Sequence, residues 1–335
     1  MFLSEVFNTD AWLEVKSVAS EEEFLDLKLL GLQSKASSTI AQYERLFSKW
    51  TSFATQRKFA AMPADKSSLA IYFNILRKTT DSKSVLESSK SAIIWAHKIA
   101  GFPNPFDNTW LSNIVEGAIR ATSGPSIGKK PVTIDIIKEI CSHTDFLNLK
   151  SLRATCMCVL LFAGFFRISE ILALKASDLN FYESHLSVFV KHSKTDQLNK
   201  GSHIVISSSL LPSCPVSITR NYLMLANIEL ESQMFLFRPL VFKAKNRYIL
   251  SPVNKNICYS TARSIVLDAI RPFVDDVTCY GTHSFRRGGA TQAANNSVDS
   301  SLLMRHGRWV SEKSKNLYAL DSLEKKLSVS SSLGI

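Results

Sequence analysis

Residues 123–131 read Ser-Gly-Pro-Ser-Ile-Gly-Lys-Lys-Pro and separate two parts of the chain that have different patterns. Glycine, serine and proline disfavour regular structure, and the two lysines keep the segment hydrated, so we predict an extended basic linker. Both flanking parts can form packed cores, because 45% of the 335 residues are hydrophobic and only 21% are charged. We therefore expect two folded domains joined by this linker.

The part before the linker carries only helical patterns. Apolar residues recur there at the spacing of one helix face, and no alternating strand pattern interrupts them. We expect residues 1–34 to form an N-terminal tail with short helical pieces, and residues 35–122 to form a bundle of about four helices. The predicted helices of the bundle cover residues 40–53, 69–76, 84–100 and 110–121.

The part after the linker is predicted to be mainly helical with one small antiparallel sheet. Leu186, Val188 and Val190 alternate with other side chains, and a polar turn leads to residues 203–206, which is the pattern of a β-hairpin. We assign residues 132–335 to this mixed α+β domain. Its predicted helices cover residues 134–140, 152–174, 216–228, 256–271, 284–295, 302–306, 311–320 and 320–329.

The charge of the chain favours a polyanionic partner. The net charge is +11, and it is unevenly distributed: residues 1–30 carry −5, residues 31–127 carry +6, and residues 128–335 carry +10. Two basic domains behind an acidic tail are typical of proteins that bind nucleic acid. A membrane protein is not expected, because the longest apolar run, Cys156–Phe166, is too short to span a bilayer.

The six cysteines predict reduced thiols rather than a metal site. They include no C-x-x-C pair, and no histidine cluster has the spacing of zinc ligands. We expect an intracellular protein with mostly buried thiols, without a secretory leader, because acidic residues rather than basic ones occupy the N-terminus. No glycine-rich phosphate loop is present, so no nucleotide cofactor is expected.

Two positions are candidates for functional residues, one before the hairpin and one within it. Arg167 begins Arg-Ile-Ser-Glu at the end of the apolar run, where an arginine needs either an anion or the carboxylate of Glu170. Three lysines lie near the turn of the hairpin, where each is either a solvated side chain or a ligand for an anion. Of Lys191, Lys194 and Lys200 we choose Lys194, because Lys-Thr follows the first strand directly.

Two further groups lie near the C-terminus. His283 and Arg286 stand three residues apart in Thr-His-Ser-Phe-Arg-Arg-Gly-Gly-Ala-Thr, so they share a face of a first helical turn whose backbone N–H groups favour an anion. Trp309 follows Gly-Arg, and Tyr318 lies nine residues later. Helix capping and core packing are the alternative interpretations of these residues.

Taken in order, these residues resemble the tyrosine recombinases, also called the phage-integrase family. The family pattern is R-x-S-E, a hairpin lysine, H-x-x-R, a later His or Trp, and a tyrosine nine residues on. The resemblance covers residues 35–327 and implies a SAM-like core-binding domain over residues 35–122 and a catalytic domain over residues 132–335. The sequence around His283 and Trp309 is most similar to the sequences of recombinases of eukaryotic mobile elements (DIRS-type and Crypton). The Trp at this position is Cre-like.

The resemblance implies a role for each matching residue. Either His306 or Trp309 can occupy the His/Trp position, and the nine-residue spacing favours Trp309. We expect DNA contacts from Lys129, Lys130, Arg287 and Arg308. The implied catalytic residues are Arg167, Lys194, His283, Arg286, Trp309 and Tyr318, with Glu170 and His306 in support.

The implied reaction is attack of Tyr318 on a DNA phosphodiester, which gives a 3′-phosphotyrosyl link. Two arginines can hold the non-bridging oxygens, His283 can accept the phenolic proton, and Lys194 can protonate the leaving 5′ oxygen. Neither a metal ion nor another cofactor is needed. Recombination implies double-stranded DNA and a homotetramer on two sites, in which the last helix packs either on its own domain or on a neighbour.

Two other functions remain open at this point. The chain can be a domesticated DNA-binding protein that keeps the recombinase fold without strand exchange. It can also relax supercoils in the manner of a type IB topoisomerase, which shares the chemistry. We expect DNA recombination and DNA integration inside the cell, and a nuclear location if the source is eukaryotic.

Overall fold

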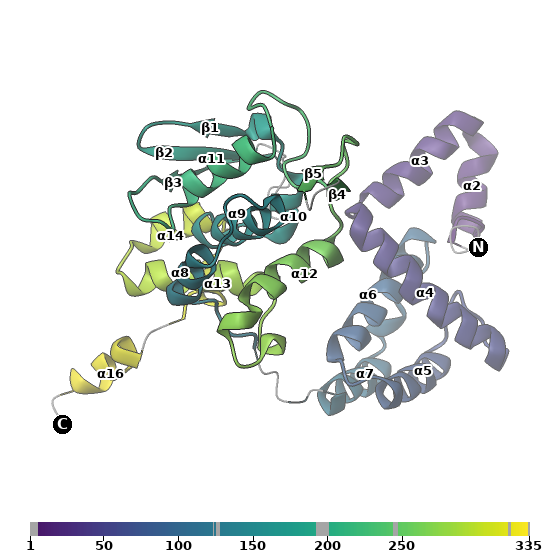
Figure 1. Ribbon diagram of the computed structural model, residues 1–335. Helices are drawn as coiled ribbons and strands as arrows, with labels where there is room; N and C mark the ends of the chain where they lie inside the picture. Colours follow the sequence, from purple (N-terminus) through teal and green to yellow (C-terminus); the bar gives the residue numbers. More distant parts are fainter. Residues whose placement is uncertain are drawn as a thin grey trace. The chain divides into compact units, whose positions relative to one another are not determined.

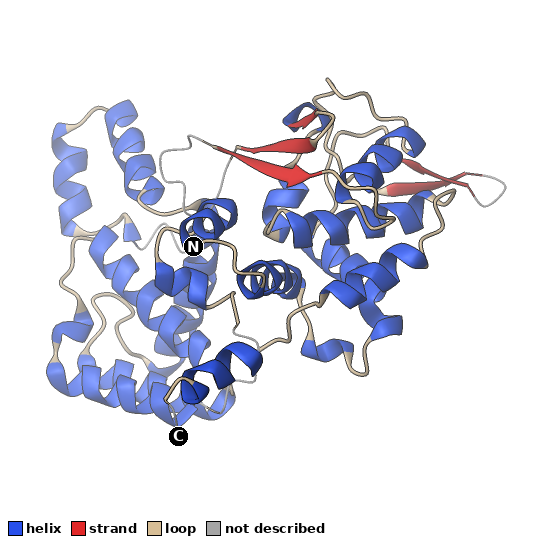
Figure 2. Cartoon of the chain, turned by 90° about the vertical axis from the view of Figure 1, so that its left-hand side faces the viewer, coloured by secondary structure: helices blue, strands red, loops and turns tan. Residues whose placement is uncertain are grey.

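The computed structural model describes residues 6–122, 124, 128–191, 201–243, 247–320 and 323–333. The chain forms two compact units, Met1–Ile127 and Gly128–Ile335. Helices dominate both units, and the strands are few and short (Figures 1 and 2). The predicted fold class, mainly helical with small antiparallel sheets, is confirmed. None of the described helices is both long and apolar enough to cross a membrane.

The first unit is a helical bundle around an aromatic core. Helix α4 packs against α6, and α5 packs against α7. Phe47, Trp50 and Phe73 are fully buried between them, and Asp65 caps α5 by accepting from the backbone N–H of Ser67. The helices of this unit are α2 (Asp10–Val18), α3 (Glu21–Gln33), α4 (Ser37–Arg57), α5 (Lys66–Thr79), α6 (Lys83–Ile99) and α7 (Thr109–Thr122).

Helices α2 and α3 belong to the first unit, although the sequence sets residues 1–34 apart as a tail. The hydroxyl of Thr9 donates to the carbonyl oxygen of Ala100 at 2.7 Å, and the indole N–H of Trp12 donates to that of Ile99 at 2.7 Å. Val6 is buried in the core of the bundle. A few side chains therefore attach the segment, and they are too sparse to give a periodic pattern in an acidic sequence.

The second unit is arranged around helix α9, which is buried along most of its length and packs against α11, α12 and α13. The predicted apolar helical stretch is split at Gly164, after which α10 begins. The helices of this unit are α8 (Ile134–Ser142), α9 (Leu149–Ala163), α10 (Ile168–Ala173), α11 (Pro215–Leu225), α12 (Tyr259–Ile270), α13 (Thr282–Asn295), α14 (Ser300–Gly307), α15 (Glu312–Asn316) and α16 (Leu323–Ser331).

Two small antiparallel sheets complete the second unit. The predicted hairpin is confirmed as β2 and β3, which pair with Val188 opposite Ile204. The sequence did not predict β1, β4 or β5. The turn of the β2–β3 hairpin, residues 192–200, lies outside the described residues, and so does the predicted general acid Lys194. The strands are β1 (Leu179–Phe181), β2 (His185–Val190), β3 (Ser202–Ser207), β4 (Leu240–Lys243) and β5 (Arg247–Leu250).

Two glycines bring helix α13 close to its neighbours. A Cβ at Gly288 would lie 1.8 Å from the carbonyl oxygen of Val132, and one at Gly289 would lie 2.1 Å from that of Phe162. The N–H of Val132 in turn donates to the carbonyl oxygen of Ser284 at 2.9 Å. The first turn of α13 is therefore fixed against both α9 and the chain that enters the unit, and this turn carries the H-x-x-R residues.

The chain enters the second unit as a segment without helix or strand. From residue 128 the backbone is described, and the N–H of Lys130 donates to the carbonyl oxygen of Cys279 at 2.8 Å. Ser123 and residues 125–127, which belong to the predicted linker, lie outside the described residues. At the other end, the ammonium group of Lys325 on α16 donates to the carbonyl oxygen of Ala294 on α13, within the same unit.

Candidate active site

Arg286 lies at the centre of a cluster formed by α13, the α9–α10 connection and the α14–α15 connection. Its side chain is fully buried, and its guanidinium donates to the carbonyl oxygens of Phe165 and Gly307. The guanidinium carbon lies 4.8 Å from a ring centroid of Trp309 and 5.1 Å from that of Tyr318. One arginine thus joins three segments that are distant in sequence.

Glu170 is the buried carboxylate of the cluster. Its Oε1 accepts from Nη1 of Arg167 at 2.6 Å, and its Oε2 accepts from the backbone N–H of Arg167 at 2.7 Å. Oε2 also pairs with Nη2 of Arg308 at 2.8 Å. Burial by itself would raise the pKa of Glu170, but the charge of Arg308 and the hydrogen bonds from Arg167 outweigh burial and lower it. The carboxylate therefore stays ionised between two guanidinium groups.

Arg308 lies inside the protein rather than on its surface. Its side chain is only 6% exposed. Besides Glu170, it reaches the carbonyl oxygen of Phe165 at 2.9 Å and that of His306 at 3.0 Å. This position differs from the DNA-facing one expected from the sequence. The physical reason is the buried Glu170 carboxylate, which attracts a second cation into the interior.

Tyr318 and His283 form the more accessible edge of the cluster. Tyr318 is half-buried just after α15, and its Oη lies 3.4 Å from Nδ1 of the exposed His283. The Tyr318 ring also lies against Trp309, with the ring centroids 5.4 Å apart. His283 and Arg286 share the first turn of α13, so one helix places an imidazole beside the phenol and a guanidinium beneath it.

The cluster has the electrostatics of an anion site. Burial lowers the pKa of Arg286 from 12.5 to about 9, and the positive charges of Arg167 and Arg308 add to this effect. Arg286 is still protonated at neutral pH, so three guanidinium groups face a single carboxylate. The indole N–H of Trp309 is buried and makes no hydrogen bond to any residue that the structure describes. The arrangement can therefore bind a group that is both anionic and a hydrogen-bond acceptor.

His306 contacts the end of α9 and the α9–α10 connection. Its Nε2 lies 2.8 Å from the carbonyl oxygen of Ala163, and its ring packs edge-on against Phe165 with centroids 4.6 Å apart. Burial lowers the pKa of His306, so the imidazole is neutral at neutral pH. Of the two residues left open for the His/Trp position, it is Trp309 that contacts both Arg286 and Tyr318.

Comparison with known proteins gives the family. The sequence model of the phage integrase family matches residues 132–324, which is more than half of the chain. The chain belongs to the phage integrase family. The resemblance to tyrosine recombinases that the sequence indicated is confirmed. Its finer part, the likeness to eukaryotic mobile elements and to Cre, is not tested by these comparisons and stays a prediction.

A curated relative and several solved structures are similar to this phage integrase family member. It is 28% identical over 293 residues to a protein described as an integrase/recombinase xerD homolog of Selenomonas ruminantium, covering 85% of this chain and 82% of the relative. Its fold is similar to that of XerH bound to a palindromic difH substrate, with TM-score 0.56, 15% identity, and coverage of 96% and 86% of the two chains.

Two further solved structures share the fold. The Tn1549 transposon integrase in complex with transposon right-end DNA aligns with TM-score 0.56 and 14% identity, over 90% of this chain and 95% of that one. A lambda integrase dimer bound to a COC′ core site aligns with TM-score 0.53 and 15% identity, over 91% and 97%. At such identities the likeness shows the fold alone.

Three lysines of the hairpin are candidates for the family's lysine position, and one of them, Lys191, lies within the described residues. The ammonium group of Lys191 pairs with Oδ1 of the buried Asp178 at 2.9 Å. Lys194 and Lys200 lie outside the described residues. The ion pair gives Lys191 a structural partner at the end of β2, and the choice of Lys194 stays a prediction.

Of the other cations expected on DNA, Lys129 and Lys130 lie at the start of the second unit and Arg287 lies on α13. The ammonium group of Lys129 donates to the carbonyl oxygen of Thr278, and the guanidinium of Arg287 donates to that of Lys129 at 2.9 Å. The side chain of Lys130 is exposed. Lys129 and Arg287 therefore hold the entering chain, although Lys129 is as exposed as Lys130. DNA contacts by these three residues stay a prediction.

Thr291 is a residue of the quoted H-x-x-R segment to which the sequence assigned no role. Its hydroxyl donates to the carbonyl oxygen of Tyr318 at 3.0 Å and accepts from the N–H of Leu320 at 3.1 Å. It therefore attaches the tyrosine segment to α13. The signal in the sequence was its spacing: Thr291 lies eight residues after His283, a little over two helical turns along α13 and within the width of one helix face.

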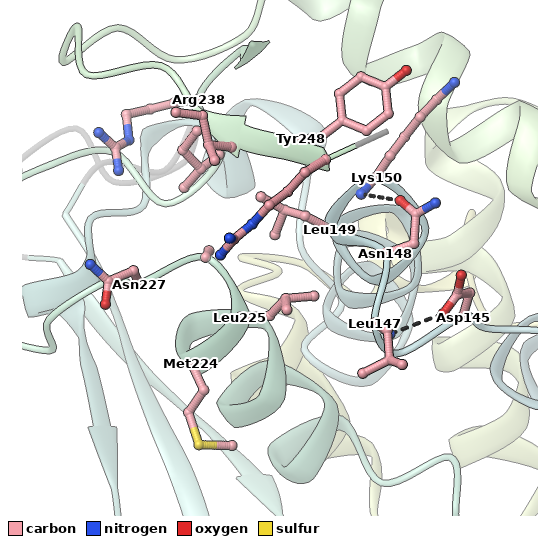
Figure 3. Close-up of a pocket in the computed structure, with 14 residues that line it drawn as sticks. Asp145, Leu147, Asn148, Leu149, Lys150, Met224, Leu225, Asn227, Arg238 and Tyr248 are labelled. Atoms are coloured by element: carbon pink, nitrogen blue, oxygen red, sulfur yellow. Dashed lines mark hydrogen bonds between the residues drawn. The ribbon is translucent and has the colours of Figure 1, made fainter. Parts of the chain in front are cut away.

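A separate cavity lies elsewhere in the second unit. It has a volume of about 1320 Å³ and is lined by residues 145, 147–150, 224–227, 238 and 247–250, none of them in the cluster around Arg286. Figure 3 shows Lys150 and Tyr248 on its wall, and Asn148 accepting from the N–H of Lys150 at the start of α9. In the described part of the chain, no three His, Cys, Asp or Glu side chains gather as they would around a metal ion.

Proposed function

We propose that this chain is a site-specific recombinase that cleaves and rejoins DNA through a 3′-phosphotyrosyl intermediate. The observation that carries the proposal is the meeting of Tyr318, His283 and Arg286, with the phenolic oxygen 3.4 Å from the imidazole and the guanidinium beside the phenol ring. These are the nucleophile, the base and the anion-binding group that attack on a phosphodiester requires.

Side chains of this chain supply the nucleophile, the base and the acid that the proposed step needs. The Tyr318 oxygen attacks phosphorus and forms an O–P bond, the P–O5′ bond breaks, and the phenolic proton passes to His283. Lys194, which lies outside the described residues, gives a proton to the departing 5′ oxygen. The bond energy is kept in the phosphotyrosyl ester, so religation by a 5′-hydroxyl needs no cofactor.

Arg286 and Arg167 have the chemistry to stabilise the transition state. A guanidinium can place two N–H donors on phosphate oxygens, and the phosphorane carries more negative charge than the ground state. The indole N–H of Trp309, buried beside Tyr318, is a further donor for a phosphate oxygen. Preorganised donors of this kind are commonly the largest contribution to catalysis.

Double-stranded DNA is the proposed substrate. The second unit is basic, the exposed Lys130 lies where the chain enters it, and three of the compared structures are complexes with DNA substrates or sites. Binding should weaken steeply with salt, because phosphate contacts release counterions. We further propose a homotetramer on two DNA sites and a role in DNA integration, in the nucleus if the source is eukaryotic.

The test traps the intermediate. Duplexes made from the DNA that flanks the gene are nicked near the expected cleavage point, so that the 5′-hydroxyl fragment diffuses away and the covalent complex accumulates. The wild-type protein should give a denaturant-stable protein–DNA band whose linkage maps to Tyr318 by mass spectrometry. Tyr318→Phe should bind the same duplexes with unchanged affinity and give no band.

Two results would contradict the proposal. A covalent band with Tyr318→Phe would remove the nucleophile. If the wild-type protein binds duplexes tightly and specifically yet gives no covalent band on any of them, the chain is a DNA-binding protein that keeps the fold without strand exchange.

A further inference from the structure

Arg308 stands at a backbone position that suits glycine. Its φ is +55° and its ψ is +41°, at the end of α14 and directly before Trp309. Side chains other than glycine are disfavoured in this left-handed region, because Cβ approaches the following carbonyl oxygen. An arginine that is also withdrawn from water must therefore make contacts that offset both strain and burial.

The contacts of the Arg308 guanidinium join the end of α14 to the α9–α10 connection and to α10. The guanidinium donates to the carbonyl oxygens of Gly164 at 3.4 Å and of Phe165 at 2.9 Å, both in the α9–α10 connection. It also donates to the carbonyl oxygen of His306 in α14 at 3.0 Å, and Nη2 pairs with Glu170 of α10 at 2.8 Å. A planar fork can satisfy these acceptors together, whereas the ammonium group of a lysine cannot reproduce that geometry.

Two of these acceptors are shared with the residues proposed to hold phosphate. Glu170 also pairs with Arg167, and the carbonyl oxygen of Phe165 also accepts from Arg286. Arg308 is therefore bound to the same anchors as both arginines. It occupies one oxygen of Glu170, and so limits how strongly that carboxylate draws the Arg167 guanidinium toward itself.

We propose that Arg308 is a positioning residue for DNA cleavage and not a DNA-binding residue. Through Glu170 and Phe165 it fixes the spacing of Arg167 and Arg286, and through its own backbone it directs Trp309 onto the Arg286 guanidinium. This inference rests on the proposed recombinase function. It replaces the phosphate contact expected for Arg308 from the sequence.

The test separates binding from chemistry in the full-length protein. For Arg308→Ala and Arg308→Lys, DNA affinity is measured across a salt series, and the rate of covalent-complex formation is measured in a single turnover at saturating nicked duplex. Arg305→Ala is the matched control, because Arg305 is an exposed arginine on the same helix. We expect Arg308→Ala to lower the single-turnover rate about 10²-fold, because small displacements of reacting groups have effects of that size.

The other measurements decide between the two roles. Affinity and its salt slope should match the wild type for both Arg308 variants, and Arg308→Lys should recover only part of the rate. Arg305→Ala should keep the rate. If Arg308→Ala instead lowers the salt slope by about one and leaves the saturating rate unchanged, Arg308 contacts a phosphate and the inference is overturned.

A second variant keeps the test decisive if Arg308→Ala does not fold. Glu170→Gln keeps the shape of the side chain but removes the charge that Arg308 pairs with, and Arg308→Lys combined with Glu170→Gln should be no slower than the slower single variant. Independent, multiplying losses would overturn the inference. Absence of a covalent band with the wild-type protein is a failure of the proposed function, and it is seen before any variant is compared.

Discussion

The two units bury different kinds of polar side chain. In the described part of the first unit the buried polar residues are Thr9, Ser68, Ser89 and His97. All four are uncharged at neutral pH, since three are hydroxyl residues and burial lowers the pKa of the histidine. The second unit also buries charged groups. These are Arg153, Glu170, Asp178, Arg238 and Arg286.

The difference shows where the chain accepts a cost in stability. Removing a charge from water is expensive unless it is paired and hydrogen-bonded, so a domain that only needs to fold avoids it. Arg153 and Arg238 show that burial alone does not mark a site, because each donates to a backbone carbonyl oxygen, of Arg238 and Ser251 respectively. Around Glu170, by contrast, guanidinium groups from two segments, those of Arg167 and Arg308, pair with one buried carboxylate. The charge of Glu170 also acts on the buried Arg286, and this gathering of charges distinguishes the candidate site.

Replacing Arg286 should have the largest effect. Arg286→Ala should reduce single-turnover cleavage by about 10³-fold, because an arginine that stabilises a phosphoryl transition state contributes that much or more. Arg286→Lys should recover little of the rate, since one ammonium group cannot replace the fork between Phe165 and Gly307. The measurement is covalent-complex formation on a nicked duplex, and a rate within tenfold of the wild type for Arg286→Ala would refute the assignment.

Replacing Gly288 should damage the fold itself. A Cβ there would lie 1.8 Å from the carbonyl oxygen of Val132, so α13 must move away from the entering chain. We expect Gly288→Ala to lower the free energy of unfolding by about 3 kcal/mol, the upper range for overpacking. Urea unfolding followed by circular dichroism measures this. A loss below about 1 kcal/mol would show that the contact with Val132 relaxes easily.

Trp309→Phe should distinguish the role of the indole N–H as a donor from the packing role of the ring. The indole N–H has no hydrogen-bond partner among the described residues, so its removal breaks no hydrogen bond of the protein, and the smaller buried ring should lower the free energy of unfolding by about 1–2 kcal/mol. If that N–H donates to the phosphate in the transition state, cleavage should fall about 10²-fold at unchanged DNA affinity, as for other single donors to an oxyanion. Cleavage at the wild-type rate would leave Trp309 with a packing role only.

The fold was largely predictable because apolar residues recur along most of its helices at the helical period. The hairpin strands β2 and β3 were long enough to show alternation, whereas β1, β4 and β5 contain three or four residues each and cannot be told from loops by pattern. The H-x-x-R pair and the tyrosine were recognisable from order and spacing. The burial of the Arg308 side chain could not be predicted, because a sequence shows neither that the backbone of this residue is left-handed nor that its guanidinium pairs with a buried carboxylate.

Acid should destabilise the first unit through His97. Its Nε2 accepts from the N–H of Ala64 at 2.9 Å while its Nδ1 contacts the carbonyl oxygen of Ile93, so only the neutral ring fits. Burial lowers the pKa of His97 below 6.5, so the unfolded state binds more protons between the two pKa values. The stability of the first unit should therefore be complete above about pH 6.5 and decline as the pH falls through that window.

Tryptophan fluorescence can follow this unfolding, because four of the five tryptophans lie in the first unit. His97→Gln keeps one donor and one acceptor without a titrating group, and should flatten the pH dependence below about pH 6.5. His143→Gln, at an exposed histidine of the second unit, is the control for a general effect of removing an imidazole. Equal pH dependence in the wild type and His97→Gln would exclude His97 as the cause.

The smallest expected effect comes from a glycine in the first unit that lacks the constraint of Gly288. Gly117 lies in the interior of α7, is exposed, and would have nothing within 4 Å of an added Cβ. Gly117→Ala should therefore raise the free energy of unfolding of the first unit by about 0.5–1 kcal/mol, because alanine loses less backbone freedom on helix formation. Urea unfolding followed by tryptophan fluorescence measures it. The same substitution should thus have opposite signs in the two units, since in one a helix meets solvent and in the other it meets a backbone carbonyl. A loss of stability for Gly117→Ala would remove the contrast and show that the space beside α7 is less open than the structure has it.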